Sequence, residues 1–326
     1  MSLETRSIET RTISETNRGT SQTLCRVCGS ETLRSSMLRY RRCQACQLLQ
    51  ADQASLPAEL SRYYSGDSFE VERNSYLRSM ARKSPRDIEW IESLVPRGKM
   101  LEVGCSWGKF LDVARDRGWQ VSGVELSQPS SEWARTELGL PVFTGKLEDS
   151  PFVGSAVFDV VATWHVIEHV PSPMEFLQAC RSCLRPGGYL VLKTPNAASF
   201  LARVNGEAWA WAQDVSHLYL FPPQSLEDAL AKSGFKVKQL FTRRGDFGNP
   251  WFEIVRGTAV KAGFHQRAKA ALHTDLAAGD SRSQRAKTLR RLNLAFDAGL
   301  FLLRPVEEVL NRLKMGPELR IVAMAV

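Results

Sequence analysis

The sequence predicts an α/β fold built on a doubly wound, mostly parallel β-sheet. Between residues 98 and 245, short apolar runs alternate with amphipathic stretches, which is typical of βαβ units. The strongest apolar runs are nearly continuous, as expected for strands that are buried on both faces. A glycine-rich segment, "LEVGCSWGKF" at 101–110, follows the first of these runs. We therefore expect one large α/β domain with a ligand-binding loop near its start.

The expected elements follow one another in regular order. Strands are expected at 99–105, 119–127, 141–145, 158–166, 188–196 and 236–244. Helices are expected where apolar residues recur at three- and four-residue spacing, at 109–118, 129–139, 172–184 and 223–235. Gly118 and Gly139 end the first two helical patterns, as glycine commonly does.

Four N-terminal cysteines have the spacing of a metal site. Cys25-x2-Cys28 is followed by fourteen residues and then by Cys43-x2-Cys46. Two such turns can place four thiolates tetrahedrally around a structural zinc ion with no open coordination position. We therefore expect a zinc-binding module over residues 23–62. A third pair, Cys180 and Cys183, has no partner pair and lies on the apolar face of an expected helix.

The residues that follow the strands are the candidate cofactor-binding residues, because ligands of such sheets bind beyond the carboxyl ends of the strands. Glycines let a backbone approach a ligand closely, and an acid about twenty residues further suits ribose hydroxyls. Glu102 would repel a phosphate, which favours a cofactor with an ammonium group. The candidates are Glu102, Gly104, Cys105, Ser106, Gly108, Glu125, Leu126, Leu147, Glu148 and Trp164.

Four ordered segments resemble the class I S-adenosylmethionine-dependent methyltransferases. They are "LEVGCSWGKF", "GVELS", "FDVVATWHVIEHV" and "LRPGGYLVLKTPN". The resemblance covers residues 63–245 and implies a Rossmann-like sheet of seven strands, with residues 317–326 as the last, antiparallel strand. It implies that the glycine loop approaches the methionine part, that Glu125 holds the ribose and that Leu147 and Glu148 lie beside the adenine. Ser106 stands where the family has its middle glycine.

The segment "HVIEHV" at 165–170 holds candidate catalytic residues. Its His-x-x-Glu-His order also occurs in zinc proteases, but Pro171 and Pro173 cut short the long helix that a protease site needs. One hypothesis is that Glu168 and His169 only cap and orient the following helix. The other is that His165 or His169 is a general base, since a hydroxyl acceptor must lose a proton.

The resemblance also implies a possible second divalent-cation site. Methyltransferases of the ubiquinone pathway and of small RNAs carry Glu-x-x-Glu-His at this place and bind a divalent cation. Here Glu168, His169 and the later His217 would be the ligands, while His165 replaces the first acid.

A helical insertion or cap is expected over residues 246–316, where apolar residues recur at helical spacing behind a cluster of basic residues. Three interpretations are open: a cap packed on the domain, a homodimer face, or an amphipathic helix on an anionic membrane that presents a lipid-linked acceptor. Residues 1–22 are polar and are expected to be a disordered tail. No apolar run is long enough to span a membrane, and we expect a cytoplasmic protein.

Net charge is +8, and the basic excess lies mainly in residues 256–326, whereas the central part is nearly neutral. This distribution argues against a central site built to grip a long polyanion. We expect an enzyme that methylates a hydroxyl or carbon of a sugar or other small acceptor in glycan or secondary-metabolite biosynthesis. The alternatives are an RNA methyltransferase, which would use the zinc module with "RYRR" at 39–42 and the basic C-terminal segment, and a scaffold without cofactor.

Overall fold

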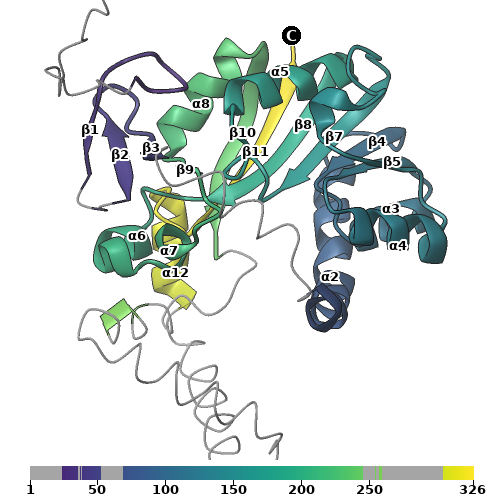
Figure 1. Cartoon of the computed structure of the whole chain (residues 1–326), viewed down its shortest axis with the longest axis horizontal. Helices are drawn as coiled ribbons and strands as arrows, with labels where there is room; N and C mark the ends of the chain where they lie inside the picture. Colours follow the sequence, from purple (N-terminus) through teal and green to yellow (C-terminus); the bar gives the residue numbers. More distant parts are fainter. Residues whose placement is uncertain are drawn as a thin grey trace, which may run out of the picture.

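Figure 1 shows the computed structural model of the chain. The structure describes residues 24–35, 37, 39–52, 69–244, 254, 257–258 and 304–326. The expected N-terminal tail lies outside the described residues, as does most of the expected helical insertion. The expectations of a dimer face and a membrane contact rest on that insertion and lie there too.

Seven strands form the central sheet in the order β10-β11-β8-β7-β4-β5-β6 (Figure 1). Neighbours from β4 to β8 pair in parallel, and β11 runs antiparallel to both of its neighbours. This arrangement confirms the predicted fold class, including the antiparallel last strand. The strands are β4 (Lys99–Val103), β5 (Gln120–Glu125), β6 (Val142–Thr144), β7 (Phe158–Trp164), β8 (Leu184–Pro195), β10 (Phe235–Arg243) and β11 (Glu318–Ala325).

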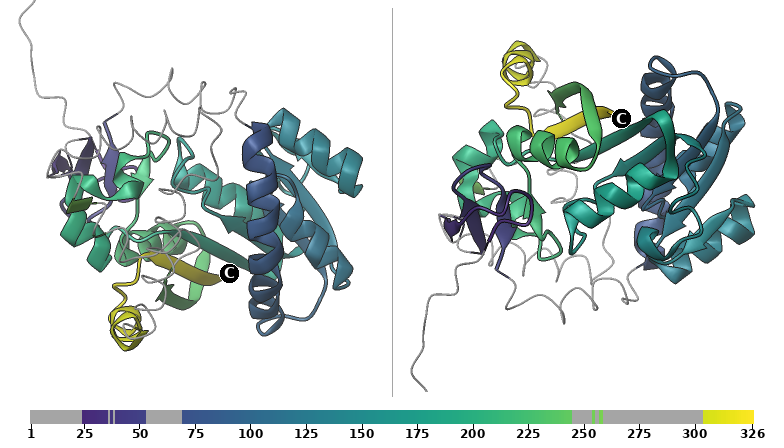
Figure 2. Two further views of the ribbon diagram at one scale, coloured as in Figure 1. Left: turned by 90° about the horizontal axis from the view of Figure 1, so that it is seen from below. Right: turned by 90° about the horizontal axis from the view of Figure 1, so that it is seen from above.

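Helices cover both faces of this sheet (Figure 2). One face packs against α2 (Phe69–Glu92), α3 (Lys109–Asp116) and α4 (Gln128–Leu138), and the other packs against α5 (Pro173–Cys183) and α8 (Pro223–Lys232). Successive strand residues point to opposite faces. Met100 and Val160 therefore join the core under α2 and α3, whereas their neighbours Leu101 and Val161 join the core under α5 and α8. This alternation explains why the strands read as continuous apolar runs.

The prediction for the third cysteine pair is confirmed. Cys180 and Cys183 are fully buried on α5, within the core that α5 shares with α8. Among the described residues neither of them belongs to a group that could hold a metal ion. They therefore act as small apolar side chains.

The segment between β8 and α8 forms short elements that periodicity did not predict. They are α6 (Phe200–Asn205), the 3₁₀ helix η3 (Gly206–Ala208), α7 (Ala210–Gln213) and the two-residue strand β9 (Tyr219–Leu220). Each is too short for a helical or alternating pattern to show. Trp209 is buried there, in a core shared with Leu201 and Leu220.

The cysteine-rich segment folds as three short strands, the last of which pairs with β9. These strands are β1 (Thr32–Arg34), β2 (Tyr40–Cys43) and β3 (Leu49–Ala51). They form a second sheet in the order β1-β2-β3-β9, in which Leu49 pairs with Leu220. In Figure 1 the purple strands lie beside α8 and far from α3 and α4. We refer to residues 24–52 as the cysteine module.

The chain returns to the sheet through α12 (Arg304–Arg312), which leads into β11. The Thr242 hydroxyl of β10 donates to the Asn311 carbonyl at the end of α12, over 3.1 Å. The helices of the described part of the chain include none with the length and apolar character needed to cross a membrane.

Candidate active site

The glycine loop after β4 has a backbone that only certain residues can adopt. Gly104 and Gly108 have φ angles of 76° and 71°, in the left-handed region that glycine enters without strain. A Cβ atom at Gly104 would lie 2.5 Å from Cγ2 of Val166, and one at Gly108 would lie 2.6 Å from Cδ1 of Leu140. Ser106 has a φ of 49°, so the loop keeps its left-handed bend at the place of the missing glycine. The loop therefore packs directly on the turn that follows β7.

Glu125, at the end of β5, ties this loop in place. Its carboxylate accepts the backbone N–H of Ser106 at 2.8 Å and that of Ser127 at 2.7 Å. Burial raises the pKa of Glu125, and these N–H donors act against that rise. Each carboxylate oxygen has a second lone pair, so Glu125 can still accept hydrogen bonds from a ribose.

Glu102 is a buried acid with one carboxylate oxygen left without a hydrogen-bond partner in the described part of the chain. Its side chain is 1% exposed, and Oε2 has no hydrogen-bond partner among the described residues. Burial, together with the negative charges of Glu125 and Asp87, raises its pKa. A buried carboxylate without a partner is costly. The ammonium group of S-adenosylmethionine would relieve this cost, so the residues present fit that cofactor.

The other expected cofactor residues lie at the same edge of the sheet with different exposures. Cys105 and Leu147 are buried, whereas Leu126 is 45% exposed and Glu148 is also exposed. Trp164 points into the layer beneath α2, where it packs edge-on against Phe110 with ring centroids 5.3 Å apart. Leu126 and Glu148 are thus open to a ligand, whereas Trp164 forms part of the wall behind the loop.

Beyond β7, at the carboxyl edge of the sheet, a histidine lies between two carboxylates. His165, which has a φ of 55°, contacts Glu168 through Nδ1 and Glu318 through Nε2, each at 3.2 Å. Burial alone would lower its pKa, but these two carboxylates outweigh burial and raise the pKa to about 9. His165 is therefore a cation at neutral pH with both ring nitrogens occupied. Its ring also stacks on Trp211 at 5.4 Å.

The charge network continues from Glu318 into the protein. Glu318 contacts Arg320 at 2.8 Å, and Arg320 contacts Asp87 of α2 at 3.3 Å. Asp87 also pairs with the buried ammonium of Lys193 at 2.7 Å. Buried charges are tolerated when each is paired, and here each cation lies between or beside carboxylates. Through Glu318, this network of ion pairs fixes the position of His165.

Glu168, His169 and His217 form a cluster whose potential ligand atoms all lie within 4.8 Å of one another. Nδ1 of His169 faces the Ser216 carbonyl at 3.0 Å, and Nδ1 of His217 faces the Trp211 carbonyl at 2.6 Å. A carbonyl can only accept, so each Nδ1 carries a proton, and Nε2 is the nitrogen that offers a lone pair when the ring is neutral. Carbonyl-anchored histidines of this kind are typical metal ligands. The cluster fits a divalent cation, and His169 also fits a general base.

The predicted site residues of this region are therefore brought together, but in two groups. His165 faces Glu168 and Glu318, and its protonation makes it a poor base. His169 and His217 lie side by side with ring centroids 4.7 Å apart. Sequence reasoning missed Glu318, Lys193 and Asp87. The signal for the first two was a charge within an otherwise apolar strand, since Glu318 begins β11 and Lys193 interrupts β8.

The four cysteine sulfurs of the module form a second cluster. Sγ of Cys25 lies 3.6 Å from Sγ of Cys46, and Sγ of Cys28 lies 3.3 Å from Sγ of Cys43. All four lie within 4.8 Å of one another. Tetrahedral zinc thiolates with Zn–S bonds of about 2.3 Å place their sulfurs roughly 3.8 Å apart. The four thiols are therefore arranged as zinc ligands.

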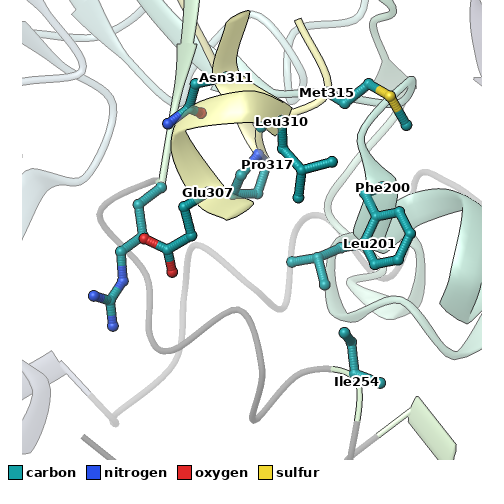
Figure 3. A pocket seen from close by; sticks show the side chains of 10 residues that line it. Phe200, Leu201, Ile254, Glu307, Leu310, Asn311, Met315 and Pro317 are labelled. Carbon is teal, nitrogen blue, oxygen red and sulfur yellow. The ribbon is translucent and has the colours of Figure 1, made fainter. Parts of the chain in front are cut away.

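A separate pocket opens between α6 and α12, near the start of β11 (Figure 3). Its walls are largely apolar, with Phe200 and Leu201 on one side and Leu310 and Pro317 on another. Gly316, which also lines the pocket, accepts a hydrogen bond from the Asn196 amide through its carbonyl at 2.7 Å. This pocket lies at the carboxyl edge of the sheet, beyond β8.

Comparison with known proteins identifies the family. A sequence profile described as a methyltransferase domain matches residues 74–240, just over half of the chain. The chain belongs to this methyltransferase family. The relatives and the profile together make it an S-adenosylmethionine-dependent methyltransferase.

Curated relatives match the core of this methyltransferase. The ubiquinone biosynthesis O-methyltransferase of Paracidovorax citrulli is 31% identical over 164 residues, which are 46% of this chain and 67% of that protein. The protein of the same name from Rhizobium etli is 28% identical over 199 residues, 56% of this chain and 76% of that one. The methyltransferase thus spans about two thirds of these relatives. A solved S-adenosylmethionine-dependent methyltransferase from Archaeoglobus fulgidus superposes with a TM-score of 0.48 at 18% identity, over 78% of this chain and 99% of that one.

These relatives correct the predicted acceptor. Their names refer to a quinone pathway, so the prediction of a sugar or glycan acceptor, with RNA as its alternative, is wrong. The structure shows why the basic "RYRR" segment was misleading. Arg39 donates to the carbonyls of Asp214 and Val215, Arg41 donates to Thr32, and Tyr40 is buried. These side chains hold the fold together.

Proposed function

We propose that this methyltransferase transfers a methyl group to a hydroxyl of a small aromatic acceptor, such as a phenol or catechol. The observation that carries the proposal is the cluster of Glu168, His169 and His217. Glu168 and His169 lie on the turn that packs against the glycine loop through Val166, and His217 joins them from the loop before β9. The names of the relatives, O-methyltransferases of ubiquinone biosynthesis, support a phenolic acceptor.

Different residues of the chain bind the cofactor and remove the proton of the acceptor. When bound, S-adenosylmethionine supplies an activated methyl group on a sulfonium sulfur. Glu102 and Glu125 would hold its ammonium and ribose groups, which orients the methyl group for in-line attack. The acceptor hydroxyl must lose its proton, and Nε2 of His169 is the available base because its Nδ1 is held by the Ser216 carbonyl.

Glu168, His169 and His217 would hold a divalent cation if one binds here. Such a cation would lower the pKa of a hydroxyl bound to it, and it would orient two neighbouring hydroxyls of a catechol. His169 would then act as a ligand in place of a base. If His169 is a general base, methyl transfer does not require a metal ion. If His169 is a cation ligand, methyl transfer does require one.

The proposal is tested with labelled S-adenosylmethionine and a panel of phenols, catechols and aliphatic alcohols. We expect label transfer to the aromatic hydroxyls and a strong loss of transfer in His169→Gln. Dialysis against a chelator, followed by Mg²⁺ or Mn²⁺ addition, separates the base from the cation ligand. Transfer to aliphatic alcohols alone, or undiminished transfer by His169→Gln, would contradict the proposal.

The cysteine module supports a structural zinc ion, which we include in the proposal. The four thiols match the sulfur spacing of zinc thiolates, and three of the four side chains are buried. A closed set of four thiolates leaves no position for a substrate. Zinc therefore serves the fold, and a cytoplasmic location, where thiols stay reduced, agrees with this chemistry.

A further inference from the structure

The loop at residues 214–218, which carries His217, is held mainly by the cysteine module. Arg39 donates its guanidinium to the carbonyls of Asp214 and Val215. The Tyr40 hydroxyl donates to the His217 carbonyl at 3.1 Å, and the Ala51 N–H donates to the Leu218 carbonyl at 2.8 Å. Four of these five successive carbonyls thus accept hydrogen bonds from the module.

The remaining carbonyl of the loop joins it to the catalytic cluster. Ser216 offers its carbonyl to Nδ1 of His169 at 3.0 Å. At the end of the loop, the N–H groups of Leu218 and of the following Tyr219 both donate to the Glu168 carbonyl, at 2.7 and 3.1 Å. The loop therefore lies between the module and the turn that carries Glu168 and His169, and it contacts all three members of the cluster.

Burial makes the contacts of Tyr40 and Ser216 rigid, whereas the Arg39 contacts lie nearer the surface. Tyr40 is 1% exposed and packs in one core with Leu49 and Trp209, and the loop residues Ser216 and His217 are also 1% exposed. A hydrogen bond in such surroundings is strong, and its loss leaves a buried carbonyl without a partner. The loop itself is only five residues long and contains no helix or paired strand before β9. Within the loop, the Asp214 carboxylate accepts the N–H and the hydroxyl of Ser216, and the Asp214 carbonyl accepts the N–H of His217. The conformation of the loop depends on this turn together with the groups that bind its carbonyls.

We propose that Arg39 and Tyr40 are positioning residues, through which the cysteine module sets the geometry of the Glu168–His169–His217 cluster. Neither residue is a catalytic residue, because each acts through the loop backbone. The catalytic meaning of this inference rests on the proposed function. Its structural content, that the module orders the loop and both histidine rings, does not.

The experiment compares the full-length protein with its Arg39→Ala and Tyr40→Phe variants. Two matched controls are Arg34→Ala, which removes an exposed arginine of β1, and Tyr189→Phe, which removes a hydroxyl from β8. Four quantities are measured: amide hydrogen exchange of residues 214–219, the imidazole NMR signals of the five histidines, affinity for S-adenosylhomocysteine, and kcat and KM for methyl transfer.

We expect faster exchange in the loop and shifted signals of His169 and His217 in both variants, with cofactor affinity unchanged. We expect kcat to fall about ten- to a hundredfold, as for groups that orient active-site ligands, and both controls to behave like the wild type. Tyr40→Phe removes a single oxygen atom, so it carries the test if Arg39→Ala fails to fold. Unchanged loop exchange and histidine signals would overturn the proposal, as would a lower melting temperature with kcat intact.

The two proposals can fail separately. If the wild type transfers no methyl group to any phenol, the proposed function fails, and the exchange and NMR measurements still decide the inference. If transfer occurs but the variants leave the loop, the histidine signals and kcat unchanged, the inference fails and the proposed function stands.

Discussion

At the scale of single residues, two buried ionisable groups of the site have opposite surroundings. Glu102 is buried without a hydrogen-bond partner for Oε2 among the described residues, whereas His165 lies between two carboxylates. Glu102 can therefore accept a hydrogen bond from a cationic ligand. The cation of His165, in contrast, is already paired with Glu168 and Glu318. This contrast separates a ligand-binding acid from a histidine that supports the site.

Glu102→Gln should weaken cofactor binding. The substitution keeps the shape of the side chain and removes the charge that would face the ammonium group. Charge-assisted hydrogen bonds contribute roughly 1.5–3 kcal/mol, so affinity for S-adenosylhomocysteine should fall about ten- to a hundredfold by calorimetry.

Stability supplies an internal check on Glu102. Removing a buried carboxylate that has no partner should leave the melting temperature equal or higher. Glu137→Gln, at an exposed position of α4, should change neither quantity. Unaltered cofactor affinity in Glu102→Gln would remove Glu102 from the cofactor site.

His165 should make the free energy of unfolding depend on pH in the alkaline range. Its pKa of about 9 in the folded protein lies above the ordinary value of 6.5, so its stabilising contribution is complete below pH 6.5. The contribution is lost as pH rises from 6.5 through 9, and the difference is on the order of 3 kcal/mol.

Denaturant unfolding at several pH values compares the wild type with His165→Gln. The wild type should lose stability between pH 6.5 and 9.5, and the variant should lack this part of the slope. Equal slopes for the two proteins would show that His165 is not held as a cation in the folded state.

At the scale of elements, the glycine loop and the turn after β7 fit together through one contact. Val166 fills the space that a Cβ atom of Gly104 would need. The cofactor loop and the turn bearing Glu168 and His169 are thereby placed against each other. A change in this contact should therefore alter both the cofactor loop and the turn that bears Glu168 and His169.

Gly104→Ala should therefore cost more than its backbone strain. Gly187 is a matched control, because its φ of 75° equals that of Gly104 within a degree, but among the described residues no atom beyond its two chain neighbours lies within 4 Å of its Cβ position. Gly187→Ala should lose about 1–2 kcal/mol from the left-handed backbone alone, and Gly104→Ala should lose more and bind S-adenosylhomocysteine more weakly.

A double variant identifies the cause. Gly104→Ala combined with Val166→Ala removes the 2.5 Å contact and should recover much of the lost cofactor affinity. If the two single glycine variants lose equal stability, or if the double variant recovers nothing, the contact with Val166 does not shape the loop.

At the scale of the whole molecule, the cysteine module and the methyltransferase core share one interior. Cys25, Cys43 and Cys46 lie in the same hydrophobic core as Leu218, Phe221 and the residues of α8. Lys232 at the end of α8 donates to the Val27 carbonyl at 3.1 Å. The module and the core should therefore unfold together.

Cys43→Ser should lower both zinc content and the melting temperature of the entire protein. Zinc binding is coupled to folding. Because the module shares a hydrophobic core with the methyltransferase, a loss of stability in the module also destabilises the rest of the protein. Calorimetry should show one transition, shifted to lower temperature. Cys180→Ala is the control, since it removes a buried thiol outside the cluster and should reduce stability without changing zinc content. Two separate transitions, with the larger one unmoved, would show that the module folds independently.

Local patterns predicted much of the fold and part of the site. Alternating apolar runs and helical spacings predicted the strands β4 to β8 and the helices between them. Their order placed Glu102, Gly104 and Glu125 at one edge of the sheet. The Cys-x2-Cys pairs predicted the cluster of four thiols. The short elements between residues 197 and 222 were not predicted, because α7 has four residues and β9 has two, so a helical or alternating pattern does not repeat within them.

The sequence by itself determined the fold class, because it depends on patterns that repeat within a few residues. Four ordered segments indicated the methyltransferase core through their resemblance to a known family. Only the tertiary structure decided which distant side chains meet. Glu318 reaches His165 across 153 residues, and Tyr40 reaches His217 across 177. These contacts follow from the antiparallel pairings of β11 with β8 and of β3 with β9. Strand pairing over such distances leaves no local periodicity in the chain. The contacts of His165 with Glu318 and of the cysteine module with the loop that carries His217 therefore emerged only from the folded molecule.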